Sequence, residues 1–161
     1  MGKIAIYPGS FDPITNGHLD IVERGLSIFD KIIVAILLNP SKESFFSVEE
    51  RMEMLQVSMN KFANVEFDVF DGLLVDYAHH RKAHAILRGM RAVSDFEYEF
   101  QMALMNRRLD RELETVFLMP SEEYTYLSSS LIKEIASAGG DISQFVPPIV
   151  VTKFEQMRKT P

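Results

Sequence analysis

The sequence predicts an α/β protein built on a doubly wound, parallel, five-stranded sheet. Short apolar runs alternate along the chain with stretches whose apolar residues recur every three or four positions, as they do in amphipathic helices. Strand–helix units of this length form parallel sheets with right-handed crossovers. No repeat, low-complexity tract or linker interrupts the 161 residues, so we expect residues 1–161 to form one domain with a sizeable core.

The first half of the chain supplies three strands, at residues 3–7, 31–38 and 65–70. The second of these is apolar almost throughout, as expected of a strand covered on both faces. The helix after the first strand has an apolar stripe at Leu19, Val22, Leu26 and Phe29. Ser47 and Glu50 form a capping box that predicts the start of the next helix. A short third helix is predicted over residues 73–81.

The second half supplies the last two strands, at residues 85–88 and 115–118. Between them, Ser94 with Glu97 predicts the cap of a long helix that ends near Leu113. A further helix is predicted over residues 128–138, closed by Gly139-Gly140, and Pro147-Pro148 precedes a final one.

The composition excludes several classes of protein. The net charge of −6 argues against a nucleic-acid-binding surface, and the absence of cysteine excludes disulfides and thiol catalysis. The N-terminus shows no signal-peptide pattern, and no apolar run approaches the length of a membrane span. We therefore expect a soluble, cytoplasmic protein that binds neither nucleic acid nor membrane.

The turn at residues 7–18, between the first strand and its helix, is the strongest candidate site. Backbone N–H groups at the start of a helix are unpaired and favour a phosphate. Gly9 and Gly17 allow a ligand close to the backbone, and His18 is the titratable group aimed into the site. We expect a surface turn, with Asp12 holding the loop. An ordinary turn capped by His18 is the alternative, while the absence of GxxxxGKS and GxGxxG patterns argues against P-loop and dinucleotide sites.

Polar residues also follow the other strands of the predicted sheet. Lys42 comes after the second strand, residues 88–91 after the fourth, and residues 120–130 after the fifth. Because ligands bind beyond the carboxyl ends of parallel strands, three cations and His18 should converge at one edge. Polyphosphate chemistry depends largely on such positioning and charge stabilisation. A chance surface cation remains the alternative for any one of them, above all for Lys42.

A serine cluster at Ser128, Ser129 and Ser130 precedes an apolar helical stretch. Three hydroxyls at a helix start can donate to phosphate oxygens together with the free N–H groups there. The alternative is a simple serine cap, which needs only one of the three.

Three motifs together resemble a known family. Thr15-Asn16-Gly17-His18 matches the T/H-x-G-H signature of the adenylyl- and cytidylyltransferase superfamily, and residues 7–18 are very similar to the same segment of bacterial phosphopantetheine adenylyltransferases. Residues 88–99 resemble that family's R-G-L/I-R-x-x-x-D-F-E-Y-E block, with Met90 for leucine. Residues 127–130 resemble its I-S-S-T/S motif, with Leu127 for isoleucine. The resemblance covers essentially the whole chain and implies a Rossmann-like nucleotidyltransferase fold.

The resemblance implies a reaction and a set of roles. The reaction joins the adenylyl group of ATP to 4′-phosphopantetheine, giving dephospho-coenzyme A and pyrophosphate. His18 would stabilise the transition state, and magnesium would accompany ATP with few or no protein ligands. The acceptor would be held by Ser10, Lys42, Leu74 and Arg88. ATP would be bound by Ser10, Phe11, His18, Gly89, Met90, Arg91, Glu99, Tyr124, Thr125, Tyr126, Leu127, Ser128, Ser129 and Ser130.

Three alternatives stay open. One is a related nucleotidyltransferase acting on nicotinate mononucleotide or glycerol phosphate, against which residues 88–99 argue. Another is a non-catalytic nucleotide-binding module, although His18 and the serines are all present. The last is a zinc site at His80 and His84, which share a helix face but lack a clear third ligand; solvated histidines are the simpler interpretation.

The predicted long helix carries two apolar stripes on nearly opposite faces. One contains Phe96, Phe100, Ala103 and Leu104, and the other Tyr98, Met102, Met105 and Leu109. A helix on a sheet needs only one stripe, so the second should be covered by another helix or another subunit, and we favour the subunit. The family resemblance implies a homohexamer, a dimer of trimers.

Overall fold

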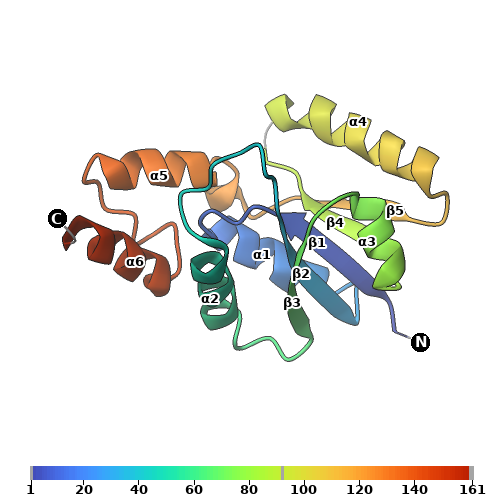
Figure 1. Ribbon diagram of the computed structural model, residues 1–161, viewed down its shortest axis with the longest axis horizontal. Coiled ribbons are helices and arrows are strands. Elements are labelled where there is room, and N and C mark those ends of the chain that lie inside the picture. The colour runs from blue at the N-terminus through green and yellow to red at the C-terminus, as the bar shows by residue number, and fades with distance from the viewer. Residues whose placement is uncertain (1, 92, 160–161) are drawn as a thin grey trace.

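Five parallel strands form a single sheet in the order β3-β2-β1-β4-β5 (Figure 1). This computed structural model describes residues 2–91 and 93–159, without the side chains of residues 93–95. The strands are β1 (Ile4–Gly9), β2 (Lys31–Leu37), β3 (Val65–Phe70), β4 (Ala85–Gly89) and β5 (Glu114–Leu118). The predicted parallel, five-stranded α/β fold is therefore confirmed, and the predicted strands match the observed ones to within one or two residues.

In the described residues, four α-helices lie between successive strands, and one 3-10 turn and two further α-helices follow β5. They are α1 (Asn16–Gly25), α2 (Val48–Ser58), α3 (Leu74–His80), α4 (Val93–Leu109), η1 (Glu122–Tyr124), α5 (Ser129–Ser137) and α6 (Pro148–Lys159). The predicted capping box is present at α2, where Ser47 Oγ accepts from the backbone of Glu50 and Glu50 Oε2 accepts from the backbone of Ser47. No helix in the described part of the chain is long and apolar enough to cross a membrane.

The prediction for α4 was wrong at its C-terminal end. The helix ends at Leu109 instead of continuing to Leu113, because Asp110 begins a turn in which its Oδ1 accepts from the backbone of Glu112 at 2.9 Å. Leu113 is buried against the sheet instead of lying on the helix. The helix begins at Val93, so Ser94 is already helical; its side chain lies outside the described residues, and with it the predicted cap.

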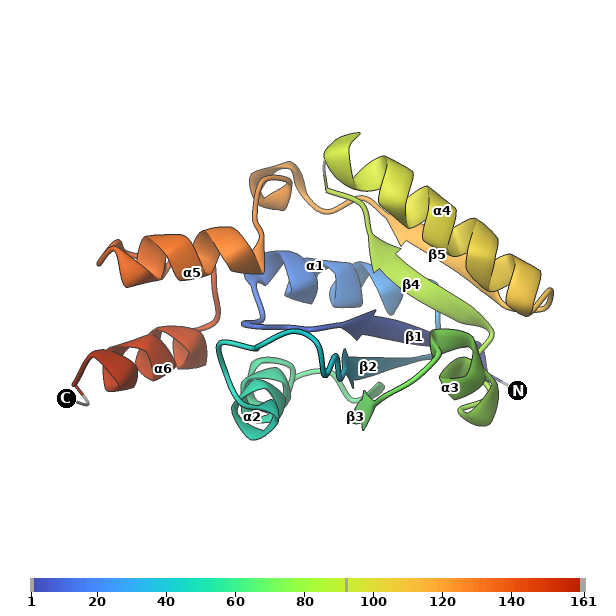
Figure 2. The same ribbon diagram turned by 45° about the horizontal axis from the view of Figure 1, so that its top comes forward.

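Both faces of the sheet are covered, as the apolar second strand predicts. Ile32, Val34 and Ile36 of β2 face a core shared with α1, α2, α5 and α6, whereas Ile33 and Ala35 face a smaller core with α3. Figure 2 shows α4 running along β5 at the far edge of the sheet. Alternate residues of one strand thus face two separate cores.

The strand order places a crevice beside β1. From β1 the chain winds outward to β2 and β3, then returns to β4 on the other side and continues to β5. In such sheets the ligand binds outside the carboxyl ends of the strands where this direction reverses, here between β1 and β4. The turn after β1 lies there, but residues 11–15 are buried, so the expectation of a surface turn was wrong.

Candidate active site

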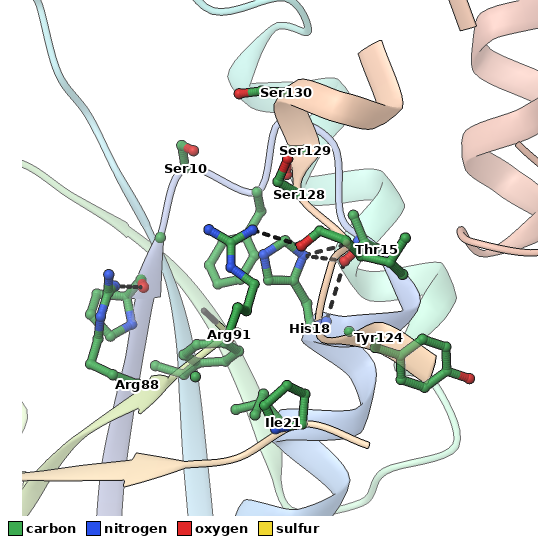
Figure 3. A pocket seen from close by; sticks show the side chains of 18 of the residues that line it. Ser10, Thr15, His18, Ile21, Arg88, Arg91, Tyr124, Ser128, Ser129 and Ser130 are labelled. Carbon is green, nitrogen blue, oxygen red and sulfur yellow. Dashed lines mark hydrogen bonds between the residues drawn. The ribbon is translucent and has the colours of Figure 1, made fainter. Parts of the chain in front are cut away.

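A cavity of about 340 Å³ opens at the carboxyl ends of β1 and β4 (Figure 3). Its walls come from the β1–α1 turn, the end of β4, one side of α4 and the segment from Pro120 to the start of α5. The structure brings twelve predicted site residues to it: Ser10, Phe11, His18, Arg88, Gly89, Arg91, Glu99, Tyr124, Leu127, Ser128, Ser129 and Ser130. Three segments far apart in sequence therefore meet at the predicted edge of the sheet.

Five predicted site residues do not line this cavity. Lys42 is exposed on the loop between β2 and α2. Leu74 opens α3 and packs against the smaller core, and Met90 lines a separate groove with α4 and β5. In the segment after η1, Thr125 Oγ1 donates to the carbonyl of Glu122, and Tyr126 is exposed beside Phe145.

The β1–α1 turn holds His18 through a capping box at the start of α1. Thr15 is the N-cap residue, and its Oγ1 accepts from the backbone of His18 at 3.4 Å. In return, the backbone N–H of Thr15 donates to Nδ1 of His18 at 2.9 Å (Figure 3). A ring nitrogen that accepts a hydrogen bond carries no proton, so a neutral His18 has its proton on Nε2. The turn therefore fixes one tautomer of the ring.

The surroundings of His18 keep it neutral. Burial, followed by the positive charges of Arg91 and Arg88, lowers its pKa from 6.5 to about 3. At pH 7 the ring therefore offers an N–H donor without a positive charge. Such a donor can stabilise an oxygen that gains negative charge, as in an oxyanion hole.

Gly9 serves a different purpose from the one expected. A Cβ at Gly9 would lie 3.0 Å from the ring of Phe11, so the missing side chain makes room for that ring and not for a ligand. The Phe11 ring in turn packs edge-on against His18, with centroids 5.1 Å apart. Phe11 has a φ of 45°, in the left-handed region that non-glycine residues rarely adopt. Such backbone strain is typical of functional sites.

Arg88 and Glu99 form an ion pair that the sequence did not predict. Nε and Nη2 of Arg88 donate to the two carboxylate oxygens of Glu99, and Nη1 donates to the carbonyl of Pro8 at 2.8 Å. Burial opposes the charged form of Arg88, but its hydrogen bonds to Glu99 and the negative charge of Glu99 outweigh burial and raise its pKa. Since a guanidinium has five N–H groups, two have no partner among the described residues and can bind a ligand.

Arg91 joins two walls of the cavity. Its Nη1 donates to the carbonyl of Leu127 at 2.7 Å, which links the segment after β4 to the serine cluster (Figure 3). The serines themselves differ in function. Ser128 caps α5 by accepting from the backbone of Leu131, while Ser129 donates its proton to the carbonyl of Pro13 at 2.7 Å.

The hydroxyls of the serine cluster differ in whether they can still donate a hydrogen bond to a ligand. Ser128 accepts a bond, and its own proton has no acceptor in the part of the chain that the structure describes, whereas the proton of Ser129 is already donated. Within the described residues the hydroxyl of Ser130 has no hydrogen-bond partner, and Ser130 is an exposed residue that lines the cavity. Two of the three predicted hydroxyl donors therefore remain available for a ligand.

Sequence reasoning missed several residues that shape the site. Tyr7 lines the cavity and is 5% exposed, and within the described residues its hydroxyl has no partner. Burial raises its pKa, so it is a neutral donor. Asp20 accepts from both the backbone and the hydroxyl of Ser121, and so ties α1 to the segment before η1. Tyr7 stands at the start of the candidate turn, but the sequence assigns no role to its hydroxyl, and no local pattern pairs Asp20 with Ser121.

The histidines near residue 80 are candidates for a zinc site, but His84 instead takes part in a backbone contact. Nδ1 of His84 accepts from the backbone N–H of Ile4 at 3.1 Å, at the start of β1. Within the described part of the chain, no group of three or more His, Cys, Asp or Glu side chains is placed to hold a metal ion. The proposed zinc pair thus gains no third ligand there.

Comparison with known proteins gives this geometry a family context. Residues 6–135 match a family model described as cytidylyltransferase-like. The chain is 64% identical over 154 residues to a phosphopantetheine adenylyltransferase of Desulfosudis oleivorans, covering 96% of this chain and 92% of that one. It is 57% identical over 159 residues to the phosphopantetheine adenylyltransferase of Caldanaerobacter subterraneus subsp. tengcongensis, covering 98% and 99%.

Solved structures share the fold at much lower identity. A provisionally assigned nicotinate-nucleotide adenylyltransferase from Vibrio parahaemolyticus superposes with a TM-score of 0.68 at 20% identity, over 96% of this chain and 99% of that one. A lipopolysaccharide core biosynthesis protein from Thermoplasma volcanium gives 0.57 at 15% identity, over 76% and 100%. At such identities the likeness concerns the fold alone.

Proposed function

The chain belongs to the phosphopantetheine adenylyltransferase family within the cytidylyltransferase-like proteins, and on this basis we propose that it transfers the adenylyl group of ATP to 4′-phosphopantetheine. The products are dephospho-coenzyme A and pyrophosphate, so the enzyme acts in coenzyme A biosynthesis. The observation that carries the proposal is the cavity itself: the neutral, oriented ring of His18 faces it together with Arg88, Arg91 and the start of α5.

The chemistry needs no covalent enzyme intermediate. An oxygen of the acceptor's phosphate attacks the α-phosphorus of ATP in line and forms a P–O bond. The bond from the α-phosphorus to the bridging oxygen of the β-phosphate breaks, and pyrophosphate leaves with its electron pair. The attacking phosphate is already ionised at pH 7, so no base is required. Catalysis then consists of positioning and charge stabilisation.

The described side chains suggest a division of these tasks. The Nε2–H of His18 would donate to an oxygen of the transferring phosphoryl group as charge develops on it. Arg91, Ser128, Ser130 and the free N–H groups at the start of α5 form the wall suited to the triphosphate. The remaining proposed ATP contacts are Ser10, Phe11, Gly89, Met90, Glu99, Tyr124, Thr125, Tyr126, Leu127 and Ser129.

The acceptor would lie towards the other strands of the sheet. Ser10 and the two free N–H groups of Arg88 face the cavity, and Lys42 follows β2, the neighbour of β1. We assign these three residues to the acceptor's phosphate and Leu74 to the pantetheine arm. Because Lys42 and Leu74 do not line the cavity, the acceptor has to extend beyond it along the strand ends.

Magnesium would enter with ATP. Glu99, a carboxylate that lines the cavity, is paired with Arg88, which leaves the phosphate oxygens of the nucleotide as the main ligands. This donor set suits Mg²⁺, which usually keeps several waters and binds through substrate phosphates. The ion would neutralise charge on the departing pyrophosphate.

We further propose a cytoplasmic homo-oligomer, a hexamer built as a dimer of trimers. The exposed apolar side chains of α4 support it. Tyr98, Met105 and Leu109 on one stripe and Phe96, Phe100 and Leu104 on the other are each about half exposed or more. Apolar surface of this extent on one helix is typical of a subunit interface.

A substrate panel tests the proposed reaction. Pyrophosphate release is measured with ATP alone and with ATP plus 4′-phosphopantetheine, nicotinate mononucleotide or glycerol phosphate. We expect release only with 4′-phosphopantetheine. Release with another acceptor would assign a different nucleotidyltransferase activity, and tight ATP binding without release would favour a non-catalytic nucleotide-binding module.

A further inference from the structure

A buried carboxylate joins the phosphate-binding turn to the loop that carries Lys42. Asp12 is 5% exposed, and both of its oxygens are used. Oδ2 accepts from the backbone N–H of Phe45 and Oδ1 from that of Phe46, each at 2.8 Å. Nζ of Lys133, on α5, lies 3.5 Å from Oδ2. One side chain therefore links the β1–α1 turn, the β2–α2 loop and α5.

The loop between β2 and α2 has few other constraints near Lys42. Its beginning is tied to β3, where the backbone of Leu38 donates to the carbonyl of Phe70 at 2.8 Å. Asn39 then forms a local turn by accepting from the backbone and the hydroxyl of Ser41. The next tie to another segment comes three residues after Lys42, where the backbone of Phe45 donates to Asp12. The backbone of Lys42 donates to the carbonyl of Asn39 at 3.1 Å within this local turn, so the tie to another segment that follows Lys42 is the one to Asp12.

Other contacts also hold the β1–α1 turn close to the start of α2, but they do not fix the backbone at the end of the β2–α2 loop as Asp12 does. Nη1 of Arg51, on α2, donates to the carbonyl of Ser10 at 2.9 Å. The ring of Phe46 is fully buried and packs edge-on against Phe154. Packing of an apolar ring has no directional requirement, whereas two adjacent N–H groups on one carboxylate fix both direction and register.

We propose that Asp12 is a positioning residue for acceptor binding, which holds the β2–α2 loop so that Lys42 reaches the acceptor's phosphate. The proposal rests on the assignment of Lys42 to that phosphate. A carboxylate is required because two N–H donors need two acceptor oxygens, and an amide offers only one. Sequence alone favours a turn residue that holds its own loop, whereas here Asp12 holds the loop that follows β2.

The test is a double-mutant cycle with Asp12→Asn and Lys42→Ala, with KM and kcat measured separately for both substrates. We expect each single variant to raise KM for 4′-phosphopantetheine roughly tenfold, which is the effect of losing one charge-assisted hydrogen bond, with little change for ATP. The double variant should be no worse than Lys42→Ala alone, because Asp12 acts through Lys42. Additive effects, or an equal rise in KM for ATP, would overturn the proposal.

A matched control uses the other carboxylate that holds a loop at this site. Asp20 accepts from the backbone of Ser121 at 2.7 Å, beside the segment assigned to ATP. Asp20→Asn should therefore shift KM for ATP instead of KM for the acceptor. The same shift from both variants would show general loosening of the fold and would also contradict the proposal.

Two further measurements cover other outcomes. If Asp12→Asn does not fold, Lys133→Met removes the cation beside Asp12 while leaving its hydrogen bonds to Phe45 and Phe46. The smaller rise in acceptor KM expected from Lys133→Met should vanish in the Lys42→Ala background. If Lys42→Ala leaves KM for the acceptor unchanged while product still forms, the assignment of Lys42 to the acceptor and the positioning role of Asp12 are both refuted. The proposed reaction would still stand. Absence of product with wild-type enzyme would instead refute the proposed function.

Discussion

Glu99 holds Arg88 by both of its carboxylate oxygens, so that the residue assigned to ATP directly supports one assigned to the acceptor. The two lie on different elements, Arg88 near the end of β4 and Glu99 on α4, and the carboxylate is 8% exposed. A guanidinium held at Nε and Nη2, and at Nη1 by Pro8, presents its remaining N–H groups in a fixed direction. The ion pair therefore orients a cation that faces the cavity.

Replacing Glu99 by glutamine should impair acceptor use. The amide keeps one acceptor oxygen but turns an NH₂ group towards the guanidinium, which frees Arg88 to move. We expect kcat/KM for 4′-phosphopantetheine to fall at least about tenfold, with some loss of thermal stability because a largely buried pair is disrupted. Glu97→Gln, an exposed neighbour on the same helix, is the control and should leave both unchanged. An unaltered kcat/KM in Glu99→Gln would show that the pair has no part in binding.

His18 should remain neutral at pH values well below 6.5, its ordinary pKa. The pKa of His18 is lowered to about 3 in the folded chain, so as the pH falls the unfolded chain binds a proton at this residue before the folded chain does. The contribution of His18 to stability is therefore present above pH 6.5 and is lost as the pH falls towards 3. Nitrogen NMR should show a protonated Nε2 and an unprotonated Nδ1 from neutral pH down to about pH 5. A titration near 6.5 would contradict the assignment.

Removing the His18 ring should slow the reaction without abolishing binding. His18→Ala takes away one preorganised donor, which costs on the order of 10²–10³ in kcat. It also removes the capping bond to Thr15, so a small drop in melting temperature should accompany the loss. Wild-type turnover in this variant would refute the proposed role.

The serines offer a matched pair of variants. The proton of Ser130 is free and that of Ser129 is donated to Pro13, so Ser130→Ala should raise KM for ATP several-fold, whereas Ser129→Ala should mainly lower the melting temperature. Steady-state kinetics and thermal unfolding of both variants separate the two effects. The reverse pattern would mean that Ser129 exchanges its partner when ATP binds.

Light scattering tests the assembly. We expect a mass near six times the 18.4 kDa of one chain at micromolar concentration. Met102→Asp with Met105→Asp places two charges on one exposed stripe of α4 and should lower that mass. A wild-type mass near 18.4 kDa would contradict the proposed oligomer.

Much of the fold follows from local sequence patterns. The apolar runs predict all five strands, and Ser47 with Glu50 predicts the start of α2, because both signals lie within a few residues. The end of α4 was mistaken because the apolar pattern continues to Leu113, while the turn at Asp110 ends the helix. A buried residue just after a helix is difficult to distinguish by periodicity from one on its apolar stripe.

The site was predictable where its residues form contiguous motifs. The turn at residues 7–18 and the serine cluster lie on one cavity, as the rule for parallel sheets implies. The contacts that orient those motifs were not predictable. Asp12 bonds to Phe45 and Phe46, 33 and 34 residues away, and Arg88 pairs with Glu99 within one motif but from a strand to a helix. No local spacing reports such pairs.

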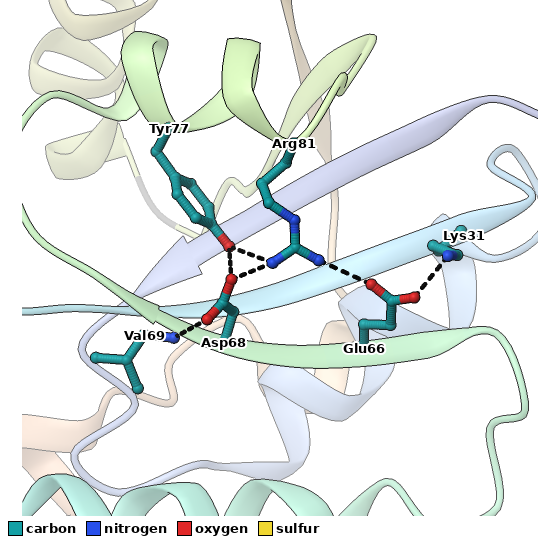
Figure 4. A network of polar contacts seen from close by, with 6 residues as sticks. All are labelled: Lys31, Glu66, Asp68, Val69, Tyr77 and Arg81. Carbon is teal, nitrogen blue, oxygen red and sulfur yellow. Dashed lines mark hydrogen bonds and ion pairs between the residues drawn. The ribbon is translucent and has the colours of Figure 1, made fainter.

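A polar network on β3, at the edge of the sheet, is a further set of contacts that local sequence patterns do not predict. On β3, Glu66 accepts from Lys31 and Arg81, and Asp68 accepts from Tyr77 and Arg81 (Figure 4). The bonds and charge of Lys31 and Arg81 lower the pKa of Glu66. The sequence shows these residues only as charges scattered among apolar positions. In the structure they tie the edge strand β3 to its neighbour β2 and to the end of α3.

The most direct measurement concerns which atoms the reaction joins. The enzyme is given ATP and 4′-phosphopantetheine whose phosphate carries a heavy-oxygen label, and the products are analysed by mass spectrometry. Attack of that phosphate on the α-phosphorus predicts dephospho-coenzyme A that retains the whole label, with unlabelled pyrophosphate in equal amount. Release of AMP, or label in the pyrophosphate, would mean that another bond is broken and would contradict adenylyl transfer at this site.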